Sequence, residues 1–350
     1  MKRNVLIDGH LVGEDEPVYI IAEACDNHLG DIKIAREMVR LAKLAGADAI
    51  KFQHHLPDEE MLPNVPASVN YNMPLYDFLK KHALHIEQHV ELKEYCQNVG
   101  IQYLCTPFSL KAAEELHKIG LEAFKIGSGE MTDIPTLKKI AEFGRPMIVS
   151  TGMSTVDEID RTYKILTDMK VPLILMHCVS EYPALYEDVN LGFIGEMIKR
   201  YDKAVIGHSD HTEDLYTCYA AVAMGAKVIE KHVITDKKLP GPDKAVSIDF
   251  YELAGLVDGI RKIEAASGVN RKVHKREFDI RAWAARSIVA LCDIQPSEVI
   301  TKDKIWSKRP GTGIPAHLMD KLIGMQAKRR IKKNSMISKD DLVGGEELQY

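Results

Sequence analysis

The sequence has no run of about 18 consecutive apolar residues, the length needed for a helix that crosses a membrane. Its first residues, MKRNVLIDGH, include two basic side chains but lack the long apolar stretch of a secretory signal peptide. We therefore expect neither a transmembrane helix nor an exported protein, and we predict a cytoplasmic location.

The sequence also lacks a CxxC pair, and its six cysteines are scattered along the chain. Scattered cysteines beside apolar residues are typical of reduced, buried thiols in a cytoplasmic protein. A catalytic thiol is the alternative interpretation for Cys25 and Cys178, which lie at the ends of two predicted strands. Buried cysteine usually behaves as a small apolar residue, which favours the first interpretation.

An excess of positive charge is absent as well. The formal net charge is −5, so nothing in the composition supports binding to nucleic acid. With 45% hydrophobic and 28% charged residues, the chain has the composition of a globular protein with a large core. Its 350 residues exceed one average domain, and we predict one large domain and one small one.

Short apolar segments with strand character alternate with helical patterns along most of the chain. Eight such units fit into about 260 residues, which is typical of a (β/α)₈ or TIM barrel. The strand segments are 18–24, 47–53, 101–106, 123–127, 146–151, 173–177, 205–206 and 228–229. An open, doubly wound sheet is the alternative, but no GxGxxG turn follows the first strand.

Other segments complete the predicted organisation. Residues 4–14 predict a hairpin with Asp8 and Gly9 in its turn. Residues 54–86 form a long, proline-containing loop, for which a lid over the barrel mouth and a passive surface excursion are about equally supported. We predict a barrel domain over 1–268, a charged linker over 269–284, and a domain over 285–350 that is small enough to need another surface to pack on.

Polar side chains lie at the end of every predicted strand, where the active site of a TIM barrel is built. These residues are Glu23, Lys51, Gln53, Thr106, Lys125, Ser128, Glu130, Ser150, Thr151, His177, Ser180, Ser209, His211 and His232. Two lysines with several hydroxyls and no acidic cluster predict a site for an anion, either phosphate or carboxylate.

His211 and His232 follow the seventh and eighth strands, which would be neighbours. Two imidazole ligands, with only Glu130 or water to complete the coordination shell, suit a divalent metal ion that keeps a coordination position free for substrate. Manganese-like and magnesium-like ions both fit, and the sequence does not choose between them. His177 and His208 are weaker candidate ligands. If His211 stood alone, the favoured interpretation would be a histidine that binds no metal. Its pairing with His232 on the next strand favours a metal ligand instead.

The chain also contains, in this order, the motifs AEACDNHLGD, AIKFQ, LCTPF, FKIGSGE, IVSTGM, HCVSEYP, IGHSDH, EKH, GPD and KRPGTG. This series resembles the sialic acid synthase family, the phosphoenolpyruvate-dependent nonulosonate synthases, over essentially the whole chain. The resemblance implies a TIM barrel followed by a small antifreeze-like (SAF) domain. It also implies a domain-swapped homodimer, in which the SAF domain of one subunit closes the barrel of the other.

The resemblance implies roles for individual residues. Phosphoenolpyruvate would be held by Lys51, Thr106, Lys125, Ser128, Ser150, Ser180 and Ser209, although many members have Asn at the position of Ser180. A divalent metal, Mn²⁺ or Mg²⁺, would be bound by His211 and His232, with catalytic roles for Glu23 and Glu130. The amino sugar would be contacted by Gln53, Asn70, Tyr182, Asp243 and, from the partner's SAF domain, Arg309; Asn70 is only a loose match.

The implied reaction joins phosphoenolpyruvate to an N-acetylmannosamine-type sugar and releases phosphate by C–O cleavage, giving N-acetylneuraminate or a close analogue. GPD at 241–243 also resembles N,N′-diacetyllegionaminate synthases, so 2,4-diacetamido-2,4,6-trideoxymannose is the alternative substrate. Synthases of 3-deoxy sugar acids lack the SAF domain that KRPGTG indicates. A catalytically inactive carbohydrate-binding relative is the non-enzymatic alternative, and the intact lysines and histidines of the site disfavour it.

Overall fold

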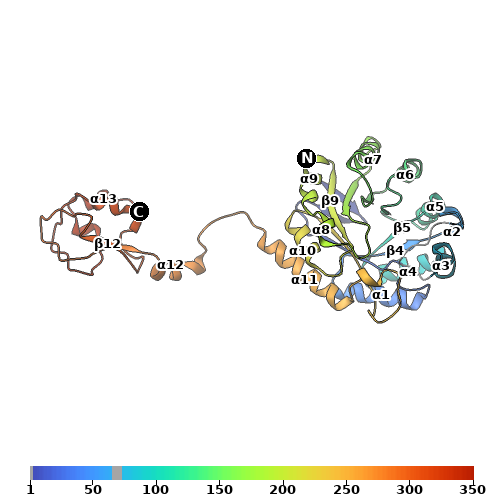
Figure 1. Ribbon diagram of the computed structural model, residues 1–350, viewed down its shortest axis with the longest axis horizontal. Coiled ribbons are helices and arrows are strands. Elements are labelled where there is room, and N and C mark those ends of the chain that lie inside the picture. Colours follow the sequence, from blue (N-terminus) through green and yellow to red (C-terminus); the bar gives the residue numbers. More distant parts are fainter. Residues whose placement is uncertain (1–2, 65–72) are drawn as a thin grey trace. The chain divides into compact units, whose positions relative to one another are not determined.

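The computed structural model describes residues 3–64 and 73–350. The chain divides into two compact units, Met1–Gly268 and Val269–Tyr350 (Figure 1). Each unit has a hydrophobic core of its own. No helix among the described residues is long and apolar enough to cross a membrane.

The first unit is a closed barrel of parallel strands surrounded by helices, which confirms the predicted fold (Figure 1). In barrel order from β3 the strands are β3 (Tyr19–Glu23), β4 (Ala49–His54), β5 (Gln102–Pro107), β6 (Phe124–Ile126), β7 (Met147–Ser150), β8 (Leu173–Cys178), β9 (Ala204–Asp210) and β10 (Val228–His232). Strand β10 pairs with both β9 and β3, so the first and last strands close the barrel.

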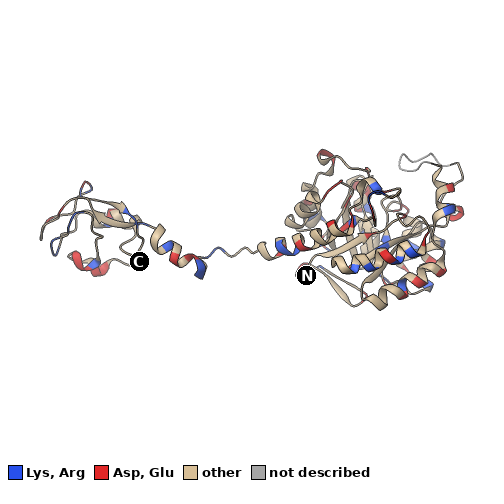
Figure 2. Ribbon diagram, turned by 90° about the horizontal axis from the view of Figure 1, so that it is seen from below, with Lys and Arg blue, Asp and Glu red and all other residues tan. Residues whose placement is uncertain are grey.

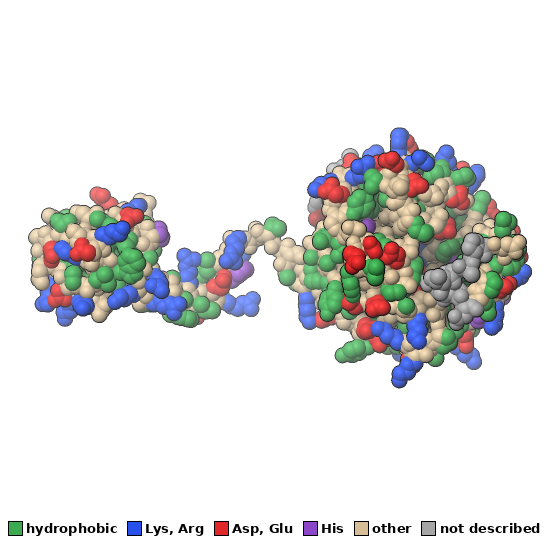
Figure 3. All heavy atoms as spheres, in the orientation of Figure 1, with side chains coloured by type: hydrophobic (Ala, Val, Ile, Leu, Met, Phe, Trp, Pro, Cys, Tyr) green, Lys and Arg blue, Asp and Glu red, His purple; other side chains and the backbone are tan. Residues whose placement is uncertain are grey.

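Most helices of this unit pack their apolar faces on the outer side of the barrel, whereas α2 buries none of its residues. The helices of this unit are α1 (Ile32–Ala45), α2 (Pro57–Glu60), α3 (Leu75–His82), α4 (Ile86–Val99), α5 (Leu110–Lys118), α6 (Ile134–Ala141), α7 (Val156–Asp168), α8 (Tyr186–Val189), α9 (Gly192–Arg200), α10 (Tyr216–Ala223) and α11 (Phe250–Ala266). Charged residues of both signs occur along them (Figure 2), and both signs are mixed over the visible surface (Figure 3).

Local sequence signals explain where several helices begin and end. Helix α7 is capped by Thr155, the residue before its first turn. The Thr155 side chain accepts from the backbone N–H of Glu158, while the Glu158 carboxylate accepts from the N–H of Thr155. This reciprocal pair is the capping box that the sequence predicts. Helix α1 ends at Gly46, whose φ of 87° lies in the left-handed region that glycine enters without a steric penalty.

The interior of the barrel changes from apolar to polar along each strand. The predicted hairpin forms from β1 (Asn4–Ile7) and β2 (His10–Gly13), and its Val5 and Ile7 join an apolar cluster with Tyr19, Ile21 and other inward-facing strand residues. Side chains alternate between the two faces of a strand. Glu23 therefore faces the same interior as Ile21, one step nearer the C-terminal ends of the strands.

The segment 54–86, predicted as a loop, contains the helices α2 and α3 in its described part. Helix α3 buries Phe78 and Leu79 and exposes basic residues near its end. The prolines on either side hide this short amphipathic pattern, because proline usually marks loops. A lid function for this segment stays a prediction.

The second unit is a small β-rich fold. It contains η2 (Lys275–Glu277), α12 (Phe278–Ala284), β11 (Ser287–Ala290), β12 (Ile305–Lys308), α13 (Met319–Leu322) and the short 3₁₀ turns η3 (Ala316–Leu318), η4 (Lys339–Asp341) and η5 (Gly345–Glu347). Strands β11 and β12 pair antiparallel over a core that includes Ile288, Ile305 and Ile337. Thus η2 and α12 lie within the segment 269–284, for which we predicted a linker.

Candidate active site

A cavity of about 700 Å³ opens among the C-terminal ends of the barrel strands. The predicted site residues that line it are Glu23, Lys51, Gln53, Thr106, Lys125, Ser128, Glu130, Ser150, Ser180, Tyr182, Ser209, His211, His232 and Asp243. Asn70 lies outside the described residues. Arg309 belongs to the second unit, where its guanidinium lies over the ring of Trp283. Residues from all eight strand ends or their loops thus meet at one cavity.

Two buried lysines and two buried carboxylates form a compact group in this cavity. Lys51 Nζ lies 2.6 Å from Glu23 Oε2 and 3.7 Å from Glu230 Oε1. Lys125 Nζ lies 3.7 Å from the same Glu230 oxygen. The prediction that the lysines have no acidic cluster beside them is therefore wrong. The sequence analysis missed Glu230, although it precedes His232 by two positions in one strand and so faces the same side.

The protonation of this group leaves it suited to an anion. Burial raises the pKa of Glu23 to about 7, even though Lys51 opposes the rise, so Glu23 is only partly ionised at neutral pH. Burial works against the charges of Lys51 and Glu230, but neighbouring opposite charges outweigh it. Glu23, followed by Glu230, raises the pKa of Lys51, and Lys125, followed by Lys51, lowers that of Glu230. Burial lowers the pKa of Lys125. One full carboxylate charge, on Glu230, and a partial one, on Glu23, thus face two ammonium groups, which leaves some positive charge for a substrate anion.

Hydroxyl groups surround the two ammonium groups. Lys51 Nζ donates to Thr106 Oγ1 at 3.1 Å, and Lys125 Nζ donates to Ser150 Oγ at 2.6 Å. Ser209 Oγ donates to Glu230 Oε1 at 3.1 Å. These hydroxyls are held by the charged groups, so each is positioned to bond an anion that enters between the lysines.

Ser128 and Ser180 approach the cavity beside a glycine. The backbone N–H of Gly152 donates to Ser128 Oγ at 3.1 Å. A side chain at Gly152 would collide with the hydroxyls of both serines, so only glycine allows them to lie this close to the chain. Ser180 thus lines the cavity beside Ser128, and its contact with phosphoenolpyruvate stays a prediction.

The two predicted metal ligands are neighbours. The ring centroids of His211 and His232 are 5.1 Å apart, and Tyr182 stacks on His211 at 4.2 Å. His211 Nδ1 lies 2.6 Å from the carbonyl oxygen of Val179, which orients its ring. His232 Nδ1 is buried, has no hydrogen-bond partner, and lies 3.8 Å from Asp243 Oδ2. A buried imidazole nitrogen without a partner, beside a second imidazole, fits a divalent metal ion.

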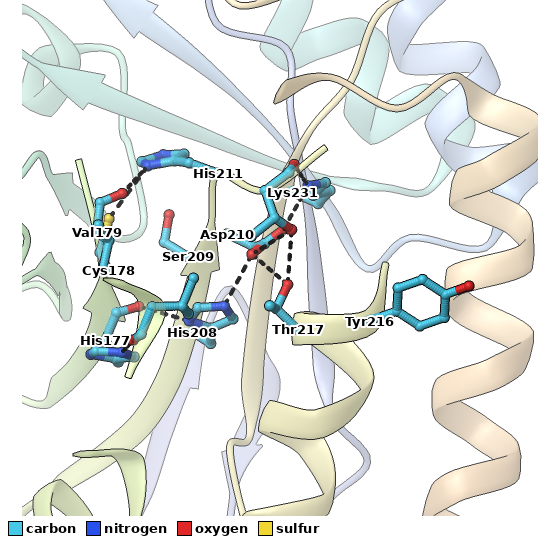
Figure 4. A network of polar contacts seen from close by, with 12 residues as sticks. His177, Cys178, Val179, His208, Ser209, Asp210, His211, Tyr216, Thr217 and Lys231 are labelled. Carbon is cyan, nitrogen blue, oxygen red and sulfur yellow. Dashed lines mark hydrogen bonds and ion pairs between the residues drawn. The ribbon is translucent and has the colours of Figure 1, made fainter. Parts of the chain in front are cut away.

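A buried ion pair between Asp210 and Lys231 joins β9 to β10 (Figure 4). Lys231 Nζ donates to Asp210 Oδ2 at 2.5 Å and to the carbonyl oxygen of Thr212 at 2.5 Å. Asp210 also accepts from Thr217 Oγ1 at 2.7 Å. Asp210 and Lys231 are opposite each other in the β9–β10 register, so this pair holds together the two strand ends that carry His211 and His232.

The weaker candidate ligands, His177 and His208, have other partners. His208 Nε2 lies 3.3 Å from Asp210 Oδ1, and His208 Nδ1 lies 3.1 Å from the carbonyl oxygen of His177. His177 Nε2 lies 2.6 Å from the carbonyl oxygen of Val189. These contacts give both rings a structural role.

Sequence reasoning also missed His55, which lines the cavity beyond Gln53. Its Nε2 lies 3.1 Å from Gln53 Oε1, and its Nδ1 lies 3.0 Å from Glu60 Oε1. Its ring stacks on Phe108 with centroids 4.2 Å apart. The only sequence feature that points to His55 as a site residue is its two-residue spacing from Gln53. This spacing is weak evidence, because His55 lies beyond the end of the strand.

Glu130 makes the stability of the barrel depend on pH. Burial raises its pKa from the ordinary 4.5 to about 7. The folded protein therefore keeps this proton to a higher pH than the unfolded chain does, and stability falls as pH rises between these values. The contribution is on the order of 3 kcal/mol. We expect Glu130→Gln to reduce the loss of stability between pH 5 and pH 8, measured by urea unfolding.

The exposed Glu142→Gln is the control for this experiment, and it should keep the parent's pH dependence. An equal loss of stability in Glu130→Gln and in the parent protein would show that the folded protein does not retain this proton.

The fold and cavity define a TIM-barrel enzyme whose strand ends hold buried lysines, hydroxyls and a pair of imidazoles. The chain belongs to the NeuB family, whose model matches residues 38–272, and the SAF domain model matches residues 285–343. The resemblance and the SAF domain that the sequence indicates are thereby confirmed, and the family is one of enzymes.

Similar proteins cover most of the chain. An uncharacterized protein of Methanocaldococcus jannaschii is 40% identical over 97% of this chain and 99% of its own length. The N,N′-diacetyllegionaminic acid synthase of Campylobacter jejuni is 35% identical over 91% of this chain and 98% of its own. A crystal structure of the N-acetylneuraminic acid (sialic acid) synthetase of Leptospira borgpetersenii, in complex with citrate, is 33% identical, with a TM-score of 0.73 over 80% of this chain and 95% of that one.

Proposed function

We propose that this protein condenses phosphoenolpyruvate with an N-acetylmannosamine-type amino sugar, giving a nonulosonic acid and phosphate. The observation that carries the proposal is the pair of buried ammonium groups, Lys51 and Lys125, among the hydroxyls of Thr106, Ser150 and Ser209. This is an environment for a small, highly charged anion. The names of the similar synthases, which make N,N′-diacetyllegionaminic and N-acetylneuraminic acid, support the same class of product.

In the proposed reaction the lysines and hydroxyls hold phosphoenolpyruvate with its C3 toward the sugar aldehyde. Bond formation at C3 leaves positive charge at C2, where water adds, and the resulting tetrahedral carbon expels phosphate by C–O cleavage. Fixing both substrates in one cavity removes much of the entropic part of the barrier. Glu23 has a pKa of about 7, so it exchanges a proton readily at neutral pH. We assign Glu23 to the sugar and Glu130 to the attacking water.

His211 and His232 are the residues that would hold a divalent ion, Mn²⁺ or Mg²⁺. When bound there, such an ion supplies Lewis-acid polarisation of the aldehyde oxygen. Tyr182 fixes the ring of His211 by stacking, and the Asp210–Lys231 pair holds the strand ends that carry both histidines. Gln53, Tyr182 and Asp243 line the same cavity and would contact the sugar.

The side of the cavity formed by α2 and α3 favours an uncharged sugar. It presents Glu60, Met61, Leu75 and Leu79, and the cavity-lining residues that the structure describes include no arginine. Apolar side chains accept acetamido and methyl groups, whereas a sugar phosphate buried beside them without a cationic partner would lose its hydration at a high cost. N-Acetylmannosamine and 2,4-diacetamido-2,4,6-trideoxymannose both meet this condition.

We also propose a domain-swapped homodimer in which the SAF domain of one subunit covers the barrel of the other. Helix α12, next to this domain, exposes Phe278, Ile280 and Trp283, each by more than half of its surface. Three large apolar side chains on one short helix are typical of a surface that packs on a partner.

Arg309→Ala tests the contribution of the partner's SAF domain. We expect the KM for the amino sugar to rise about 10- to 100-fold, the effect of losing a charged hydrogen bond. The KM for phosphoenolpyruvate should stay within about twofold, because Lys51 and Lys125 lie in the barrel. Steady-state kinetics with each substrate varied would check both values. An unchanged sugar KM would show that Arg309 does not reach the site.

The proposed function is tested by incubating the protein with phosphoenolpyruvate, Mn²⁺ and each of the two amino sugars in parallel. We expect phosphate and a nonulosonic acid in equal amounts, with one sugar preferred. A carbohydrate-binding protein without activity would bind sugar and release no phosphate. Absence of phosphate with both sugars would contradict the proposal.

A further inference from the structure

Three potential metal ligands meet beside the cavity, and one of them, Cys25, has no role in the proposed reaction. Cys25, His232 and Asp243 each place one ligand atom within 4.8 Å of the others, and all three are buried. Cys25 lies two positions after the end of β3, His232 ends β10, and Asp243 lies in the segment that follows. Their meeting depends on the closure of the barrel between β10 and β3.

Cys25 differs from the other two residues in that it does not line the cavity. Its φ is 40°, in the left-handed region that a residue with a side chain rarely enters. Such backbone positions persist only where the surrounding structure holds them, and they are concentrated at ligand-binding sites. The proposed reaction gives the thiol no role. It hydrogen-bonds to Asp243 and lies near His232, whose Nδ1 is buried without a hydrogen-bond partner.

The three ligand atoms are a sulfur, a nitrogen and a carboxylate oxygen. Zn²⁺ binds this combination in four-coordinate sites, where three protein ligands leave one position for water. Mn²⁺ and Mg²⁺ prefer oxygen ligands, and they bind thiolate poorly. A thiolate therefore favours Zn²⁺ over the Mn²⁺ or Mg²⁺ proposed for His211 and His232.

We propose that Cys25, His232 and Asp243 form a second metal site, selective for Zn²⁺, that shares His232 with the site of the activating metal. On binding, the Cys25 thiol loses its proton to solvent and a sulfur–zinc bond forms. A neutral imidazole has only one nitrogen with a free lone pair, so Zn²⁺ and Mn²⁺ compete for His232 and exclude each other. Zn²⁺ also takes Asp243 away from the sugar, so it inhibits. Inhibition rests on the proposed function, whereas binding does not.

Binding is measured first, on the reduced, metal-free, full-length protein. Co²⁺ is the spectroscopic probe, because a bound thiolate adds a sulfur-to-cobalt charge-transfer absorption. Affinity for Zn²⁺ is measured by competition with a coloured chelator. We expect the thiolate absorption with one Co²⁺ per chain, and its loss when Zn²⁺ is added. A Co²⁺ spectrum without thiolate absorption would overturn the proposal, with no variant needed.

Cys25→Ser is the decisive variant, since serine has nearly the same size and keeps a hydrogen-bonding group beside Asp243. We expect its affinity for Zn²⁺ to fall at least tenfold, because losing even an indirect partner of a metal ligand costs about 10- to 100-fold. Mn²⁺ binding, measured by electron paramagnetic resonance, should be unchanged. Cys292→Ser, which changes a thiol of the second unit, should bind both ions like the parent protein.

The outcomes separate the two proposals. Equal Zn²⁺ affinity in Cys25→Ser and the parent protein would overturn the zinc site, and Cys25→Ala repeats the test if the serine variant fails to fold. Zinc binding that depends on Cys25, in a protein that releases no phosphate, would support the zinc site and contradict the proposed function. Turnover with Mn²⁺ that Zn²⁺ inhibits in the parent but much less in Cys25→Ser would support both.

Discussion

His211→Ala and His232→Ala are each expected to lower Mn²⁺-dependent phosphate release by about 1,000-fold or more. Metal polarisation of a carbonyl is worth several kcal/mol of transition-state stabilisation, and about 4 kcal/mol corresponds to this factor. The two rings are neighbours, with centroids 5.1 Å apart, and neither has a substitute in the same position. Phosphate release under saturating phosphoenolpyruvate and sugar, with and without Mn²⁺, measures the effect.

The matched control is His10→Ala, which removes an exposed imidazole from β2 and should retain full activity. Circular dichroism of each variant shows whether the barrel still folds. Near-normal phosphate release by a folded His211→Ala or His232→Ala variant would contradict the metal assignment, and a loss of activity without a loss of Mn²⁺ affinity would place the histidine elsewhere in the reaction.

Lys231→Met is expected to lower the free energy of unfolding by about 3–5 kcal/mol, the cost of leaving one partner of a buried ion pair alone. Both side chains are at most 1% exposed, so water does not replace the lost ammonium. Burial alone would raise the pKa of Asp210, but His208 and Lys231 outweigh it and hold that pKa below its usual range. Urea unfolding followed by far-UV circular dichroism, which reports mainly on the barrel helices, measures the loss.

Lys164→Met provides the comparison. It removes the same ammonium group from an ion pair with Asp168, but the two side chains are 75% and 62% exposed. Exposed pairs contribute about 0–1 kcal/mol, so this variant should unfold almost like the parent. If Lys231→Met were equally mild, the Asp210 carboxylate would have to find other partners or become protonated in the folded protein.

Much of the site was predictable because strand ends in a TIM barrel meet at one place whatever their distance in sequence. Lys51, Lys125, His211 and His232 follow from this rule, and the structure places all of them around one cavity. Glu230 was missed although it begins the polar end of β10, because nothing local distinguishes a carboxylate that faces the lysines from one that faces water; its contact with both lysines is seen only in the folded barrel.

The sequence by itself determined the eightfold alternation of strands and helices, the polar residues at the strand ends, and the family. These features depend on side-chain periodicity and on local order, which the chain displays directly. Only the tertiary structure decided which of those residues touch: Glu230 against the two lysines, Lys231 against Asp210, and Cys25 against His232 and Asp243. The reason is physical, because each contact depends on strand register and barrel closure, which bring together residues far apart in the chain.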